Sequence, residues 1–413
     1  MGGAREVGRI GITVKSAKSK VVLDYGVMLD HEPGFPMHIP PKELDAVILT
    51  HSHLDHSGAI PIFYINDKKP LITNKLNLEL TQVLIQDFIH LSSYYLPFEY
   101  LELNTMMHNS KHIDFGVEDN IGDMKVKLFD AGHTPGSAQV LIEADGKKIL
   151  FTGDYNMEDS KMLKGASMDY GDLDAVITES TYASEDHTLR PELEKSFVEA
   201  ATEVVERGGT VLVPAFGVGR AQEIACVLAA NHFEYPIVLD GMAREASRIM
   251  MNYKEFLKDP RLFTNAMHSL DWVDGWRDRR RAAKDPGVVI SPAGMLKGGP
   301  SQFYISKIAK KPNNAIFLVS YQIPGTPGKQ LMDKGVTLID GKVRKVKAQF
   351  RHFDFSSHCG ATQLKEGLRR LGGKPKVFAV HGAEGNCELF ANWAKTELGL
   401  EAAAPRTGET YEI

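Results

Sequence analysis

The stretch "DAVILTHSHLDHSGAIP", residues 45 to 61, packs three histidines and an aspartate into six positions directly after an apolar run. A short apolar run of this kind predicts a buried β-strand. His51 and His53 are two residues apart at the end of that expected strand, so their side chains leave it on the same side. Asp55 and His56 follow where the chain turns. These four side chains are of the types that bind Zn²⁺.

Three further apolar runs lead into a residue that can bind a metal, namely His133 after "VKLFDAG", Asp154 after "KKILFTG" and His381 after "KVFAV". A single histidine after a strand is commonly a packing residue, and motif matches carry false positives. Because a sheet edge gathers residues that are distant in sequence, the combination favours a binuclear metal site. The expected division of ligands is His51, His53 and His133 for one ion, Asp55, His56 and His381 for the other, and a bridging Asp154.

The length and composition indicate a protein of ordinary globular type. A chain of 413 residues fits two domains, and 43% hydrophobic with 24% charged residues are usual values. We expect no membrane partner, because no apolar run is long enough to cross a bilayer and no cleavable signal opens the chain. Three scattered cysteines suit a reducing, cytoplasmic location. The net charge of −5 means that any polyanion would have to meet a local basic surface.

The pattern of apolar runs changes twice along the chain. Short β-branched runs dominate residues 1–184, with a helix expected at about 77–91. Residues 185–344 alternate strands and helices, and their continuous apolar strands are typical of a parallel sheet covered on both faces. The earlier style returns in residues 345–413, where a helix is expected at about 384–398. The second domain is therefore expected to be inserted into the first.

At this point the chain resembles the metallo-β-lactamase superfamily. "HSHLDH" at 51–56, His133 in "AGHTPGS" and Asp154 in "FTGD" look like successive ligand motifs of that superfamily. Asp24 in "VVLDYG" looks like its early buried aspartate, which supports the ligand loop from behind. The resemblance implies an α/β fold, with an αββα sandwich as the first domain.

Further motifs resemble the β-CASP nucleases within that superfamily. Glu179 in "ITEST", His358 in "FSSHCG" and His381 in "VHGAEGN" look like the additional β-CASP set. "GGAREVG" and "PAFGVGRAQE" are also similar, and "SPAGMLKGGP" is closer to the cleavage-and-polyadenylation endonuclease branch, with its archaeal members, than to the RNase J branch. The inserted segment is then expected to be a β-CASP α/β domain.

This resemblance implies a ribonuclease that uses two Zn²⁺ ions and a metal-bridging hydroxide to cleave RNA phosphodiester bonds in RNA 3′-end processing or decay. Endonucleolytic cleavage is expected, and 5′–3′ exonuclease activity is left open. Histidine at position 381 resembles the RNA-cleaving members. Modules appended in some relatives for RNA binding or dimerisation are expected to be missing before residue 1 and after the final strand, and a homodimer is left open.

Asp55, Glu179 and His358 are the expected catalytic residues. Imidazole titrates near the working pH, so His358 is a suitable proton donor to the departing oxygen, and Glu179 would orient it and keep it protonated. The alternatives from sequence alone are a helix-capping or surface acid for Glu179 and an ordinary loop histidine for His358.

Two segments are candidates for contact with a single-stranded RNA substrate. In "AFGVGRAQE", Arg220 begins an expected helix, whose free N–H groups favour anions. In "GKVRKVKAQFRH", the residues Lys345, Lys347 and Arg351 share one face of an expected strand and would line an RNA channel. The arginine-rich "WRDRRRAAK" at 276–284 is interpreted as a solvated helix face.

Three other functions compete with this reading. A small-molecule metallo-hydrolase that cleaves a thioester or lactam would use the same metal ligands, but it needs neither the inserted domain nor Glu179 and His358. An oxygen-reducing di-iron protein is disfavoured, because His53 lies where a carboxylate would suit iron better. A catalytically inactive RNA-binding scaffold is disfavoured because no expected ligand is missing.

Overall fold

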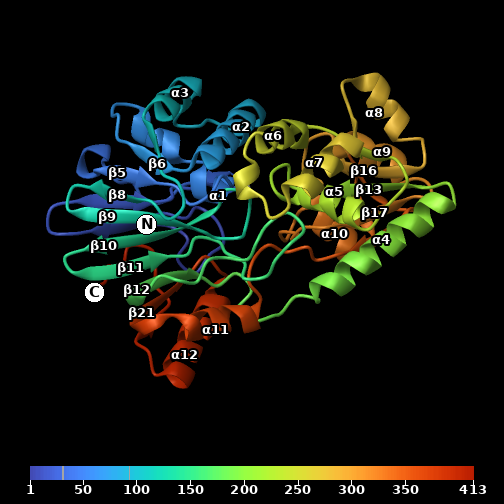
Figure 1. The fold of residues 1–413 in the computed structure, drawn as a ribbon. Coiled ribbons are helices and arrows are strands. Elements are labelled where there is room, and N and C mark those ends of the chain that lie inside the picture. The colour runs from blue at the N-terminus through green and yellow to red at the C-terminus, as the bar shows by residue number, and fades with distance from the viewer. Residues whose placement is uncertain (30–31, 93) are drawn as a thin grey trace. The chain divides into compact units, whose positions relative to one another are not determined.

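The computed structural model describes residues 1–29, 32–92 and 94–413 and divides into two compact units (Figure 1). The first unit consists of Met1–Asp159, Lys164–Asp186 and Ser357–Ile413. The second consists of Ser160–Leu163 and His187–Ser356. The chain leaves the first unit and later returns to it, so the second unit is an insertion.

Two sheets lie face to face in the first unit. The five-stranded sheet has the order β1 (Ile12–Lys15), β2 (Lys20–Leu23), β5 (Ala46–Ile48), β6 (Leu71–Thr73), β7 (Ser110–His112). The seven-stranded sheet has the order β22 (Ala402–Ala403), β21 (Gly372–Val380), β12 (Asp172–Glu179), β11 (Lys147–Phe151), β10 (Ala138–Ala144), β9 (Met124–Asp130), β8 (Glu118–Ile121). Their inward faces share one core, in which Val21 and Ile48 of one sheet pack with Val140 and Ile177 of the other.

Helices cover the outer face of each sheet. On the five-stranded sheet these are α2 (Lys75–Leu91) and α3 (Tyr100–His108), and on the seven-stranded sheet α11 (Ala361–Arg370) and α12 (Glu384–Leu398) (Figure 1). The Asn74 side chain accepts from the Asn77 N–H and starts α2, while Gly399 in the left-handed region ends α12. The αββα sandwich and both expected helices are confirmed. Among the described residues, no helix combines the length and apolar character needed to cross a bilayer.

The second unit is built on a parallel sheet. Its order is β15 (Asp271–Trp272), β14 (Ile237–Leu239), β16 (Gly287–Ser291), β13 (Thr210–Pro214), β17 (Ala315–Leu318), β20 (Gln349–His352). Every residue of β13 and β16 is buried, as the continuous apolar runs predict. The helices of this unit are α4 (Arg190–Glu206), α5 (Arg220–Ala230), α6 (Met242–Met251), α7 (Pro260–Ser269), α8 (Trp276–Ala282), α9 (Ser301–Ile308) and α10 (Pro327–Lys334). A separate hairpin joins β18 (Val336–Ile339) to β19 (Lys342–Lys345).

The segment around residue 345 differs from the sequence analysis. The return to the first domain was expected at residue 345, whereas the second unit continues to Ser356, because β20 pairs with β17. The prediction that Lys345, Lys347 and Arg351 share one face of a single strand is wrong. Lys345 ends β19 and Arg351 lies in β20, since the buried Val346 and Ala348 pack into the core and break the strand between them.

Candidate metal centre

The "HSHLDH" motif lies in a loop and a short helix rather than in a strand. Strand β5 ends at Ile48, and α1 (Leu54–Ser57) begins directly after His53. His51 and His53 therefore do not leave one strand face, as the sequence analysis expected; they converge because the loop turns between them. Asp55 and His56 lie on α1.

Asp24 holds this loop from behind. Its carboxylate is fully buried and accepts hydrogen bonds from the Thr50 N–H and the Thr50 hydroxyl, each at 2.7 Å. The Nδ1 atom of His56 lies 2.7 Å from the same carboxylate. One buried aspartate thus fixes both ends of the loop and the orientation of the His56 ring.

The other candidate residues lie at strand ends of the seven-stranded sheet, as the sequence predicts. His133 follows β9, Asp154 follows β11, His381 follows β21, and Glu179 is the last residue of β12. These four strands run in the same direction, since β9 and β11 are both antiparallel to β10 and the remaining pairs are parallel. Their carboxyl ends therefore meet at one edge of the sheet.

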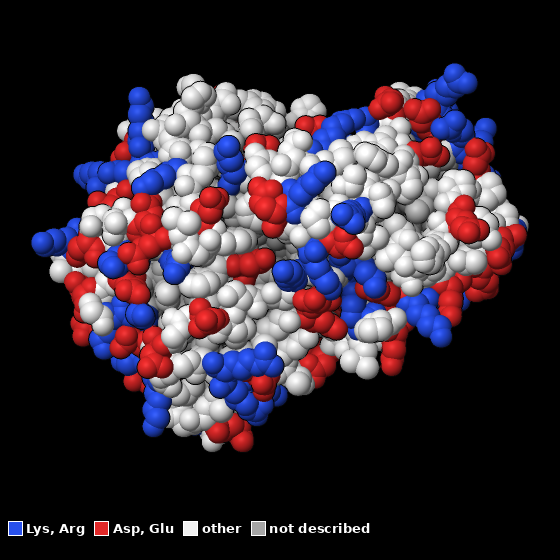
Figure 2. Space-filling model, in the orientation of Figure 1, with Lys and Arg blue, Asp and Glu red and all other residues white. Residues whose placement is uncertain are grey.

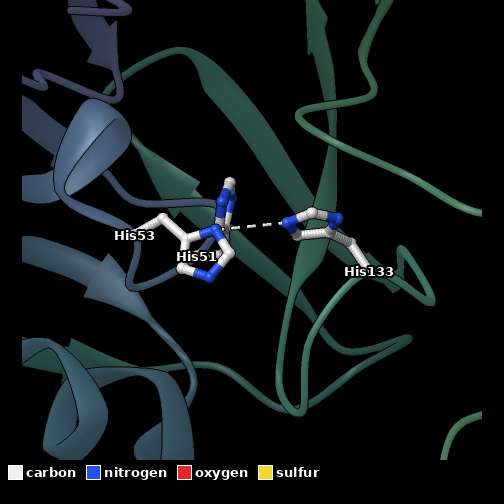
Figure 3. A group of neighbouring side chains, drawn as sticks. All are labelled: His51, His53 and His133. Carbon is white, nitrogen blue, oxygen red and sulfur yellow. Dashed lines mark hydrogen bonds between the residues drawn. The ribbon is translucent and has the colours of Figure 1, made fainter. Parts of the chain in front are cut away.

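The metal-capable side chains meet in two groups. His51, His53 and His133 bring their ligand atoms within 4.8 Å of one another, and so do Asp55, His56 and His381. Figure 3 shows the first group, in which His133 Nε2 faces His53 Nδ1 at 3.3 Å.

Asp154 lies between these two groups. Its Oδ2 atom is 3.8 Å from His133 Nε2 and 3.3 Å from His56 Nε2, and its Oδ1 atom is 3.3 Å from His381 Nε2. The side chain is 2% exposed, so it has almost no contact with solvent. One carboxylate therefore reaches both halves of the cluster.

Burial keeps the first group in the state that binds metal. It lowers the pKa of His51, His53 and His133, so these rings are neutral and each has a lone pair available. His56 differs: burial opposes its charge, but Asp154 in front and Asp24 behind raise its pKa. For Asp154, burial is outweighed by His381, His56 and His358, which lower the pKa of its carboxyl.

The donor set fits divalent cations. The buried Nε2 atom of His51 has no hydrogen-bond partner among the described residues, an arrangement that is costly unless something else binds it. Ligands at tetrahedral angles and a metal–nitrogen distance of 2.0–2.1 Å are about 3.3 Å apart. That spacing matches the 3.3 Å between His133 Nε2 and His53 Nδ1.

Glu179 and His358 form a pair at the rim of the cluster. Glu179 is fully buried, and His358 Nδ1 lies 2.8 and 3.0 Å from its two carboxylate oxygens. The Tyr155 N–H donates to the same carboxylate at 2.8 Å. The other ring nitrogen of His358 lies 3.9 Å from Asp154, and the side chain is 19% exposed. His358 therefore has one nitrogen on a buried acid and the other toward the donor cluster.

Backbone and hydroxyl contacts that the sequence analysis missed orient the histidines. The Ser357 carbonyl accepts from His133 Nδ1 at 2.9 Å, which leaves the Nε2 lone pair to face the cluster. His381 has a left-handed backbone conformation, with a φ of 46°. The His381 N–H donates to the Gly3 carbonyl, and the Thr181 hydroxyl donates to the His381 carbonyl, so both backbone groups are fixed. No local pattern marks these partners, since most lie about 200 residues or more away.

The residues expected to bind RNA lie in the second unit, apart in sequence from the donor cluster. Arg220 is the first residue of α5 and follows Gly219, which has a φ of 85°. Lys345, Lys347 and Arg351 are exposed. Arg351 lies 3.8 Å from Glu203 on α4.

Comparison with known proteins gives matches along most of the chain. Residues 14–215 match the model of the metallo-beta-lactamase superfamily, residues 221–331 the Beta-Casp domain, and residues 343–405 the Zn-dependent metallo-hydrolase RNA specificity domain. The chain is 40% identical over its full length to "RNase aCSPSF2" of Saccharolobus solfataricus, of which it covers 84%. The chain belongs to the β-CASP family of the metallo-β-lactamase superfamily.

Two further relatives of this β-CASP protein come from Methanocaldococcus jannaschii. "Probable RNase MJ4" is 35% identical, with 100% of this chain and 99% of the relative covered. "Transcription termination factor FttA" is 34% identical, with 100% and 71% covered. A crystal structure of a protein of unknown function from Enterococcus faecalis V583 has the same fold, with a TM-score of 0.62 at 14% identity and 99% and 97% coverage. The fold of this family implies that the β-CASP protein binds divalent metal at the His and Asp cluster.

Proposed function

We propose that the protein is a zinc-dependent ribonuclease that cleaves single-stranded RNA endonucleolytically, with two Zn²⁺ bound by His51, His53, Asp55, His56, His133, Asp154 and His381. The observation that carries the proposal is one largely buried cluster of seven donors with the Glu179–His358 pair at its rim. Two relatives are named as RNases, and residues 343–405 match an RNA specificity domain, so RNA is the substrate that these similarities support.

Zinc suits this cluster because five of the seven donors are imidazoles, which Zn²⁺ accepts readily, whereas Mg²⁺ and Ca²⁺ prefer oxygen ligands. When bound, two such cations supply an activated water near neutral pH and positive charge for the phosphate oxygens. Asp154 would join the two donor groups, since its Oδ2 atom lies near His133 of one group and near His56 of the other.

The chain's own acid is His358. A departing RNA oxygen needs a proton, and a cationic His358 ring donates one from Nε2, the nitrogen on the side of the cluster. The buried Glu179 carboxylate binds Nδ1, which fixes the ring and favours its charged form. Burial opposes that charge, but Glu179 and Asp154 outweigh it and raise the pKa of His358 to about 9.

The substrate is tested by cleavage of matched nucleic acids. We expect single-stranded RNA to be cut far faster than single-stranded DNA of the same sequence. An RNA with a 5′-monophosphate and its 5′-triphosphate twin, each labelled at either end, should give the same internal fragments if the enzyme is an endonuclease. Products that shorten only from the monophosphorylated 5′ end would instead make it a 5′–3′ exonuclease. Equal cutting of RNA and DNA would exclude the ribonuclease assignment.

The RNA-binding role proposed for Lys345 and Lys347 is tested by salt dependence. Each cation that contacts a phosphate releases condensed counterions, so log affinity falls with log salt by about 0.7 per contact for single strands. Lys345→Ala/Lys347→Ala should flatten that slope by roughly 1.4 and weaken binding equally for unrelated RNA sequences. Zinc content should stay the same, because neither lysine is among the donors. An unchanged slope would place the RNA path elsewhere.

A thioester- or lactam-cleaving enzyme is the second candidate, because it would use the same metal donors. It would not require the Glu179–His358 pair, and it would leave RNA intact.

Arg220 at the start of α5 is proposed as a further phosphate contact. A cytoplasmic location and a homodimer stay predictions.

A further inference from the structure

Helix α8, Trp276–Ala282, carries an unusual set of side chains for a seven-residue surface helix. Its sequence "WRDRRRA" holds four arginines and one acid, and Trp276 is 60% exposed. A large exposed aromatic side chain among cations is not explained by the core, because exposing apolar surface to water is unfavourable. Figure 2 shows Lys and Arg side chains, with Asp and Glu side chains among them, at the upper right, where Figure 1 labels α8.

The Trp276 ring is held in place although it is exposed. The guanidinium of Arg279 lies 5.0 Å from the ring centroid, and its Nε and Nη2 atoms bond to the buried carboxylate of Asp240 at 2.6 and 2.8 Å. The Tyr304 hydroxyl donates to the same carboxylate at 2.9 Å. Phe303 of α9 meets the tryptophan edge to face, with ring centroids 5.5 Å apart. The ring is therefore presented in a fixed position.

The other arginines of α8 are available to a ligand. Arg277, Arg280 and Arg281 are exposed and form no ion pair with a carboxylate of the described residues, whereas Arg279 of the same helix is bound to Asp240. The Nε–H group of Arg280 donates to the Trp276 carbonyl, within its own helix. The one acid of α8, Asp278, accepts from the Asp274 N–H.

Cations continue from α8 across α9 to the β18–β19 hairpin. Lys307 Nζ lies 5.9 Å from the Phe303 ring, next to the tryptophan. Lys310 Nζ lies 2.7 Å from the carboxylate of Asp340 in the hairpin. The hydrogen bond from Lys310, together with the charges of Lys310, Lys307 and Arg344, lowers the pKa of Asp340. Around Asp340, one acid faces three cations, so the hairpin end of the row keeps a net positive charge.

We propose that this row forms a contact surface for single-stranded nucleic acid, with a base stacked on Trp276 and backbone phosphates bound by Arg277 and Arg280. It deepens the proposed function, on which it rests for the choice of RNA as the natural ligand. Single strands offer both a phosphate charge and an exposed base face, the two groups that this surface matches. In a chain of net charge −5, such a local basic surface is where a polyanion binds.

Tryptophan fluorescence tests the stacking. The chain has three tryptophans, Trp272, Trp276 and Trp393. The zinc-loaded full-length protein is titrated with oligothymidylate, which shares phosphates and base faces with RNA but is not the proposed substrate. Binding should quench the wild type, and Trp276→Phe should lose that quenching although two tryptophans remain. Trp276→Ala should raise Kd roughly 5- to 100-fold, as expected for one lost stacking contact. Equal quenching in Trp276→Phe, or an unchanged Kd in Trp276→Ala, would overturn the proposal.

The charge contribution is measured separately. Arg277→Ala/Arg280→Ala should lower the slope of log affinity against log salt by about 1.4. The matched control Lys195→Ala/Lys254→Ala removes two exposed cations from elsewhere in the same unit and should leave the slope unchanged. Equal slopes for the two double variants would contradict the proposal. If RNA is cleaved but binding does not depend on Trp276, the proposed contact surface is refuted and the proposed function stands. If binding depends on Trp276 but RNA is not cleaved, the proposed function is refuted and the contact surface stands.

Discussion

His358→Ala is expected to retain both zinc ions and yet to cleave RNA roughly 10²- to 10⁴-fold more slowly, the usual loss for a positioned acid. The reason is its position: Nδ1 lies 2.8 Å from Glu179, and Nε2 points toward the donors without completing either of the two main groups. Turnover of a defined RNA and zinc per chain, measured on the same preparation, check the result. His358 also lies near His133 and Asp154, so a variant that loses zinc would make this histidine a ligand instead.

Glu179→Gln is the companion variant, and it should show a milder loss. The donor works while protonated, so activity falls as pH rises through the pKa of His358. Removing the Glu179 charge lowers that pKa, so the basic limb of the pH–rate profile should move to lower pH. Bound cations lower the pKa of His358 in both proteins, and comparing the two metal-loaded enzymes therefore isolates the contribution of Glu179. If the basic limb of the pH–rate profile lies at the same pH in both enzymes, Glu179 does not control the pKa of the proton donor.

Asp154→Ala is expected to abolish RNA cleavage and to weaken the binding of both zinc ions at once. Its two oxygens face both donor groups, and the remaining donors would have no carboxylate between them. Purified wild-type protein should carry close to two zinc ions per chain, and elemental analysis after dialysis should find far less in the variant.

A matched control keeps this result specific. Asp174→Ala removes an aspartate from the same unit that is paired with Lys147 at the surface, and it should keep both ions and full activity. Full activity in Asp154→Ala, or wild-type protein with almost no metal, would refute the metal assignment.

Much of the site could be predicted because its donors follow local rules. His133, Asp154 and His381 each come after an apolar strand, and four strands in one direction must bring such residues to a common edge. The helices at 75–91 and 384–398 could be predicted for a similar reason, since helical spacing of apolar residues is a local property. The order of layers came from the family resemblance rather than from periodicity.

What could not be predicted depends on contacts between distant residues. The Gly3 carbonyl on His381 and the Ser357 carbonyl on His133 are backbone groups, which no side-chain pattern distinguishes. Lys345 and Arg351 were expected on one strand because their spacing is even. Burial of Val346 and Ala348 separates them, and that burial exists only once the hairpin and the sheet of the second unit have formed.

The seven donors are spread along the chain from His51 to His381, and the inserted unit lies between them. During synthesis, His51 leaves the ribosome on the order of tens of seconds before His381, at 5–20 residues per second. A nascent chain therefore has the first group of donors early but lacks the last histidine of the second group throughout that interval. If His381 is a metal ligand as proposed, the second group of donors is incomplete, and the nascent chain is inactive against its own messenger RNA, until the ribosome has passed the codon for His381.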